Sequence, residues 1–293
     1  MPKHHRTPRP LGRGGCHIPN VCKKEMGKSF TIAPKSHNAH SVRGGYFPLP
    51  PQVVGPDTWH NLMSANYGVN PIDGTRLVKP TFDQVAELAG DALTDRYVHK
   101  EDGRFNPAFN PVIDAINGAG KVLTGNSLIV VTPTRAYFIN NPNQVLRAQF
   151  GVNDQGVLEE NVANFDKQLK GKKQETGIAY ADNIAAVSVA NVSQGTQSKD
   201  PRADTFLGNN VGLIALVRNR KVAESLAVGS KAYKSEPYFS LNAENNKIVT
   251  RVPVLIACVV DNRLFVGGVG FAVGGNRCSF GYSETGEASV QKK

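Results

Sequence analysis

The first forty residues contain many side chains that commonly bind metal ions. Five of the seven histidines and two of the four cysteines lie in this segment, and the candidate ligands are Cys16, His17, Cys22, His37 and His40. Thiolate and imidazole groups are the usual ligands of Zn²⁺, and metal binding can supply the free energy that orders a polar segment. The spacing argues against a zinc site, because five residues separate Cys16 from Cys22 where structural sites usually have two to four. We therefore expect no cofactor, with zinc as the alternative.

The same part of the chain carries most of the positive charge. Residues 1–45 hold nine Lys and Arg residues and one acid, Glu25, so they account for +8 of the formal +10 and leave +2 for the remaining 248 residues. This asymmetry indicates an acidic partner for the segment, most often nucleic acid, RNA or DNA, whose phosphates release counterions when they are neutralised. The residues predicted to bind nucleic acid are Arg6, Arg9, Arg13, Lys23, Lys24, Lys28, Lys35, Arg43, Lys170, Lys172 and Lys173. For the last three, a solvated turn is the alternative.

Composition divides the chain into three parts. Residues 1–45 are rich in Pro, Gly and His, and they contain too few large apolar residues to offset the entropy of folding alone. We expect them to form an extended basic N-terminal arm. We expect residues 46–75 to form an extended, proline-rich linker in which Tyr46 and Phe47 anchor the arm. Residues 76–293 predict a single β-rich globular body.

The fold class predicted for the body is α+β, mainly antiparallel β in residues 121–293 with one clear helix at about 81–100. Thr81 and Gln84 form a capping-box pattern at the start of that helix, and apolar residues follow at helical spacing. A shorter helix is expected at 111–117. Runs of branched residues bounded by turn residues predict strands at 126–132, 135–139, 183–192, 211–217, 247–260 and 263–273. Residues 164–176 and 193–210 are expected to be polar loops.

Two glycine-rich segments lack the context of nucleotide-binding motifs. NGAGKVLTG at 117–125 has Ala115 where a phosphate-binding loop needs its first glycine, and Val122 where it needs Ser or Thr. VGGVGFAVGGN at 266–276 lies inside a strand pattern and precedes no helix. Neither segment therefore predicts nucleotide chemistry. An acid–histidine pair, Asp57 and His60 in DTWHN, is the remaining local candidate for catalysis, and the alternative is that the two residues serve a turn or the surface.

The segment VGGNRCSFGY at 273–282 resembles the glycine-rich C-terminal loop of the RAMP superfamily, to which the backbone subunits of CRISPR complexes belong. The likeness covers about ten residues and is carried by Gly274, Gly275, Arg277, Phe280 and Gly281. It implies an RNA-binding backbone subunit of a ribonucleoprotein.

The sequence favours a non-enzymatic, self-assembling structural protein of the viral or phage coat type. Such a protein would package nucleic acid through its basic arm and would contact copies of itself in a homo-oligomeric assembly. The RAMP-like subunit is the first alternative, and an enzyme with a pocket near residues 193–210 is the second. The start of the chain has no apolar core of a signal peptide, and its apolar runs are too short to span a bilayer, so we expect an intracellular or virion protein without membrane contact.

Overall fold

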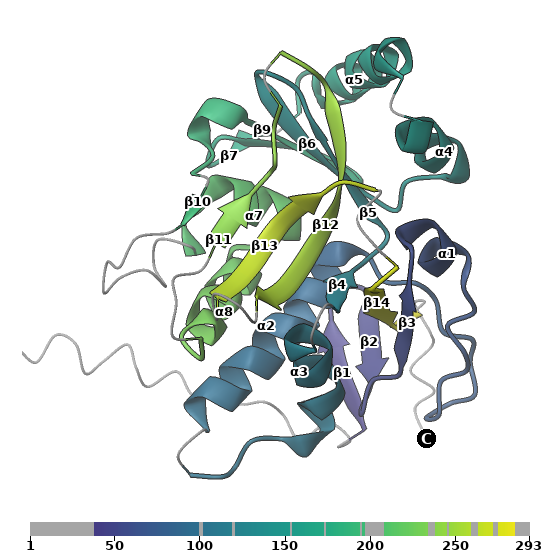
Figure 1. Cartoon of the computed structure of the whole chain (residues 1–293), viewed down its shortest axis with the longest axis vertical. Coiled ribbons are helices and arrows are strands. Elements are labelled where there is room, and N and C mark those ends of the chain that lie inside the picture. The colour runs from purple at the N-terminus through teal and green to yellow at the C-terminus, as the bar shows by residue number, and fades with distance from the viewer. Residues whose placement is uncertain are drawn as a thin grey trace, which may run out of the picture. The chain divides into compact units, whose positions relative to one another are not determined.

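The computed structural model describes residues 38–99, 102–118, 121–152, 154–172, 174–193, 195–196, 208–233, 238–244, 246–258, 263–271 and 275–284. They belong to one compact unit, His37–Lys293. Helices and strands are both abundant in it (Figure 1), which confirms the predicted mixed α+β class.

A large mixed sheet forms the centre of this unit. Its strands run in the spatial order β10-β11-β13-β12-β5-β6-β9-β8-β7, and β4 joins it by pairing with β12. In chain order these strands are β4 (Val122–Thr124), β5 (Ser127–Val131), β6 (Arg135–Asn140), β7 (Gln174–Glu175), β8 (Ile178–Ala181), β9 (Ile184–Ser188), β10 (Gly195–Thr196), β11 (Tyr238–Ser240), β12 (Val249–Cys258) and β13 (Arg263–Val269). The strand β14 (Arg277–Phe280) extends it by pairing with β3 (Val53–Asp57) and β4.

A second, three-stranded sheet lies at the start of the described chain. It has the order β1-β2-β15, with bounds β1 (Ala39–Val42), β2 (Gly45–Pro48) and β15 (Ser283–Glu284). The hairpin of β1 and β2 is therefore held by a strand from the other end of the described chain.

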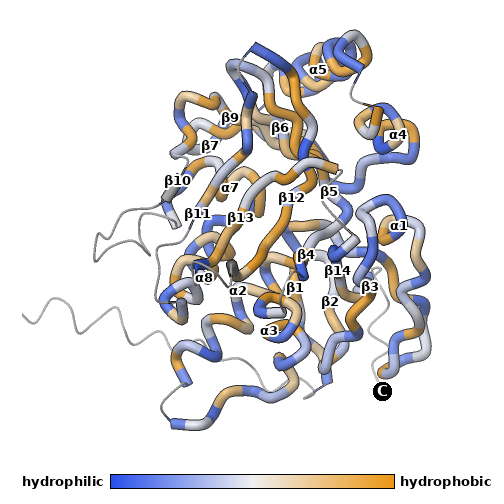
Figure 2. The backbone as a smooth tube through the Cα atoms, in the orientation of Figure 1, coloured by the Kyte–Doolittle hydropathy of each residue, from blue (hydrophilic) through white to orange (hydrophobic). Residues whose placement is uncertain are grey.

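The large sheet separates two hydrophobic cores. Successive residues of β5 alternate between them: Ile129 and Val131 face one core, whereas Leu128 and Val130 face the other. The first core contains residues from α2 (Phe82–Val98), α3 (Asn110–Asn117), α7 (Val211–Val217) and α8 (Arg220–Ser230). The second contains residues from α1 (Trp59–Ser64), α4 (Gln144–Val152) and α5 (Gln155–Leu169). Figure 2 shows the central strands β12 and β13 as strongly hydrophobic, which suits strands covered on both faces.

The predicted helix at 81–100 is present as α2. The backbone N–H of Thr81 donates to Oε1 of Gln84 at 2.8 Å, as a capping box requires. Residues 107–109 form a short 3₁₀ helix, η2 (Pro107–Phe109), that leads into α3, and a second, η3 (Val189–Asn191), follows β9. The helix predicted at 111–117 is α3.

Two parts of the predicted pattern are wrong. Residues 211–217 form helix α7 and not a strand; all but Val211 are buried, so the segment has no polar face to reveal a helical period. Residues 164–169 of the loop expected at 164–176 are the last part of α5, whose N-terminus is capped by Asp154, which accepts from Val157 N at 3.2 Å. The body therefore has several helices besides α2.

The sheet is also not purely antiparallel. The pairs β11–β13 and β14–β4 are parallel. In the chain, β12 separates β11 from β13, and β14 is distant from β4. No hairpin turn in the sequence therefore marks either pair.

The predicted arm and linker contain ordered elements. Residues 39–48 form the β1–β2 hairpin, and the expected linker contains most of β2, all of β3 and α1. Over the described part of the chain, no helix is long and apolar enough to cross a membrane.

Candidate nucleic-acid interface

The β1–β2 hairpin is the first element of the described chain, and residues 1–36 precede it in the sequence. Phe47 on β2 is fully buried, with its ring edge-on to Phe280 at 6.4 Å between centroids and tilted against Tyr282 at 5.3 Å. The Tyr46 hydroxyl donates to Oδ2 of Asp73 at 2.7 Å. Both aromatic residues that the sequence suggested as anchors thus contact the body.

Arg43 lies in the turn of this hairpin and is tied to two helices. Its Nη1 lies 3.3 Å from Oδ2 of Asp83, and its backbone N–H donates to Oε2 of Glu87 at 3.1 Å, both on α2. Its Nη2 donates to the carbonyl of Arg218, the residue that follows α7, at 2.7 Å. Its own carbonyl accepts from the Tyr282 hydroxyl at 2.9 Å. The guanidinium is about half exposed, so it is both a structural contact and a surface cation.

Asp83 connects Arg43 to the interior of the body. Its side chain is buried, and Oδ1 accepts hydrogen bonds from the Thr81 hydroxyl and, at 2.9 Å, from Nδ2 of Asn140. Oδ1 of Asn140 in turn accepts from the Ser127 hydroxyl at 2.7 Å. We call Asp83, Arg43, Thr81, Asn140 and Ser127 the Asp83 network. It joins the hairpin, the start of α2 and strands β5 and β6.

His40 contacts an acid in the described chain. Its Nε2 lies 3.1 Å from Oδ2 of Asp91, and its ring meets Phe109 edge-on at 5.3 Å between centroids. No group of three or more potential metal ligands occurs among the residues with described positions. The other four predicted zinc ligands, Cys16, His17, Cys22 and His37, lie outside the described residues, so the zinc site stays a prediction.

The lysines predicted as a second phosphate-binding patch follow α5. Lys170 and Lys172 are exposed there, and Lys173 lies outside the described residues. These lysines lie between the end of α5 and β7 (Figure 1). The remaining predicted contacts also lie outside the described residues: Arg6, Arg9, Arg13, Lys23, Lys24, Lys28 and Lys35.

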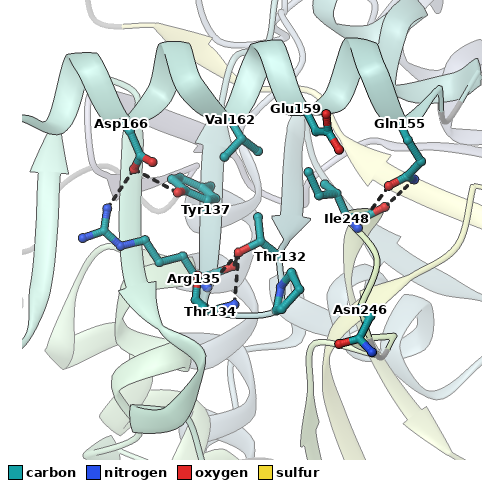
Figure 3. A pocket seen from close by; sticks show the side chains of 11 residues that line it. Thr132, Thr134, Arg135, Tyr137, Gln155, Glu159, Val162, Asp166, Asn246 and Ile248 are labelled. Atoms are coloured by element: carbon teal, nitrogen blue, oxygen red, sulfur yellow. Dashed lines mark hydrogen bonds and ion pairs between the residues drawn. The ribbon is translucent and has the colours of Figure 1, made fainter.

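A polar pocket of about 540 Å³ lies between α5, the turn joining β5 to β6, and the segment before β12 (Figure 3). In it Nη1 of Arg135 and the hydroxyl of Tyr137 both contact Oδ1 of Asp166, at 2.7 and 2.9 Å. Burial, with Asp166 nearby, raises the pKa of Tyr137 to about 12, so this phenol is no base at neutral pH. Glu159 adds a second acid to the lining. Two acids and one cation do not suit a phosphate.

Asp57 and His60 do not form the pair that their spacing suggested. Oδ1 of Asp57 accepts from the backbone N–H of Thr58 at 2.6 Å and from Nδ2 of Asn61 at 2.8 Å. His60 instead stacks on Phe271, with centroids 5.5 Å apart and an angle of 19° between the rings.

The residues that carry the RAMP-like resemblance are largely internal. Arg277 and Phe280 are buried in β14, and a Cβ atom on Gly281 would lie 2.6 Å from the Leu77 side chain. Gly275 is exposed, and Gly274 lies outside the described residues.

Comparisons with known proteins show no family for this chain. No protein-family model matches it, and no curated protein matches it. A solved structure described as "Accommodation of massive sequence variation in Nanoarchaeota by the C-type lectin fold" matches with 10% sequence identity and a TM-score of 0.38, covering 80% of this chain and 98% of that chain. A similarity of this size identifies neither a fold nor a function.

We expect Asp83→Ala to destabilise the body by about 2–4 kcal/mol, because it leaves the buried amide of Asn140 without its acceptor and removes the partner of Arg43. Urea denaturation monitored by circular dichroism measures this change. The control is Asp114→Ala on the exposed side of α3, which should change stability by less than about 0.5 kcal/mol. Equal stability of the two variants would contradict the role given to Asp83.

Proposed function

We propose that this protein is a non-enzymatic structural protein that coats or packages nucleic acid and assembles with copies of itself. The observation that carries the proposal is the segregation of charge. Residues 1–36 contain eight Lys and Arg residues and one acid, a formal +7, whereas residues 37–293 carry +3. A segment of this charge density neutralises phosphates without reading their sequence.

The attachment of the segment to the body supports the same function. The β1–β2 hairpin is fixed by a buried aromatic side chain, a strand pairing with β15 and the contacts of Arg43. The residues that follow the basic segment in the sequence are therefore fixed on the body. Copies arranged side by side can then bring their basic segments to one polyanion, and the low net charge of the bodies limits the repulsion between them.

The test is nucleic-acid uptake by the full-length protein. We expect replacement of six arm residues by Gln, namely Arg6, Arg9, Arg13, Lys23, Lys24 and Lys28, to remove nucleic acid from the purified protein. The ratio of absorbance at 260 and 280 nm should fall to that of protein alone, and negative-stain microscopy should show the loss of nucleic-acid-filled particles.

A variant with the same change in charge serves as the control. It replaces six exposed cations of the body by Gln: Arg76, Arg104, Lys167, Arg220, Lys221 and Lys247. We expect it to retain its nucleic acid. Unchanged uptake in the arm variant, or an equal loss in the control, would overturn the proposed function.

A further inference from the structure

An aromatic stack lies at the surface of the body beside α1. Trp59 is fully buried, and its indole N–H donates to the carbonyl of Gly125 at 3.0 Å. Its ring meets those of His60 and Phe271 edge-on, at centroid distances of 5.3 and 5.5 Å. His60 is exposed and Phe271 is partly exposed. The buried Trp59 ring therefore packs against the stacked rings of His60 and Phe271, which are in contact with solvent.

Helix α4 brings a cation to this stack. Gly151 on α4 packs against the His60 ring, since a Cβ atom there would lie 3.3 Å from both Cε1 and Nε2. Arg147 is one helical turn before Gly151 and therefore lies on the same side of α4. Its Nη1 donates to the Pro142 carbonyl at 3.1 Å and to Oδ1 of Asn126 at 3.4 Å. Asn126 directly follows Gly125, whose carbonyl accepts the hydrogen bond from Trp59.

Two more cations converge on the same place. Lys79 donates to the Met63 carbonyl in the last turn of α1 at 2.8 Å, and the next residue, Pro80, accepts a hydrogen bond from the N–H of Asn126. Arg277 is buried, and its guanidinium binds the carbonyl of Phe271 at 3.2 Å. We call His60, Phe271, Arg147, Lys79 and Arg277 the α1–α4 patch.

No acid of the described chain forms an ion pair with this patch. None of the ion pairs between described residues involves any of its four basic members. Burial and the charges of Arg277 and Arg147 lower the pKa of His60, and burial and Arg147 lower that of Lys79. The patch therefore combines a positive potential with an exposed aromatic ring.

We propose that the α1–α4 patch binds single-stranded nucleic acid, with a base stacked on His60 and its phosphate against Arg147 and Lys79. Stacking platforms bordered by cations are the usual means of binding single strands without reading their sequence. A cation cluster alone would suit any phosphate, and the exposed ring favours a ligand that also carries a base. The choice of nucleic acid rests on the proposed function, although the site needs no residue of the basic segment.

The test uses the full-length protein in which the six arm residues are Gln, so that the arm does not mask the patch. Binding of a short fluorescent oligothymidylate is measured by anisotropy. Binding of inorganic tripolyphosphate is measured by its ability to displace this oligonucleotide. We expect Arg147→Gln to weaken oligonucleotide binding about tenfold, as loss of a hydrogen bond to a charged group does. His60→Ala should weaken it by a similar factor through lost stacking, and His60→Phe should restore it.

Arg104→Gln is the matched control, because it removes the same charge from an exposed site paired with Asp102. It should bind as the parent does. Equal binding by the parent, His60→Ala and Arg147→Gln would overturn the site. Complete competition by tripolyphosphate together with unchanged binding by His60→Ala would overturn the stacked base. Because six of the eight arm cations are replaced in all these variants, failure here is distinct from failure of the packaging test.

The pH dependence of this binding follows from the depressed pKa of His60. A phosphate beside the ring opposes the charges of Arg147 and Arg277, the ionised groups that lower this pKa, and so raises it in the complex. The complex then takes up a proton, and affinity should rise a few-fold as pH falls from about 7 to about 5. The His60→Phe variant should lose this dependence. An affinity in the parent that is flat or falls over this range would contradict the proximity of phosphate to His60.

Discussion

The buried carboxylate of Asp83 is the constraint on which the arrangement of this protein depends. A buried charge is tolerated only when its hydrogen-bonding capacity is filled, and here Thr81, Asn140 and Arg43 fill it. These three residues come from the cap of α2, from the central sheet and from the first hairpin. One carboxylate therefore joins the first described hairpin to the start of α2 and to the central sheet.

The proposed function divides two tasks between the parts of the chain. The body buries two cores on either side of one sheet and keeps its net charge low, which suits a protein that packs against its own copies. The segment before it concentrates charge and contains few apolar residues. On the body itself, the α1–α4 patch is a second place where cations lack acidic partners in the described chain. If both bind the same strand, the segment supplies long-range attraction and the patch supplies a defined contact.

Much of the fold could be predicted because its signals are local. The capping box at Thr81 and Gln84 identified α2, and the branched runs identified β5, β6, β12 and β13. Helix α7 was mistaken for a strand because burial on nearly every side removes the helical period. The Asp83 network and the α1–α4 patch could not be predicted, since they depend on tertiary contacts: Asn140 is 57 residues from Asp83, and His60 meets α4 only in the folded chain.

The most direct measurement is the salt dependence of the affinity of the full-length protein for single-stranded nucleic acid. Each phosphate neutralised on a single strand contributes a slope of about −0.7 to a plot of log affinity against log salt concentration. Eight cations in residues 1–36 therefore predict a slope of roughly −5.6, falling to about −1.4 when six of them are replaced by Gln. A slope close to zero for the full-length protein, or one unchanged by the replacements, would contradict binding through the basic segment.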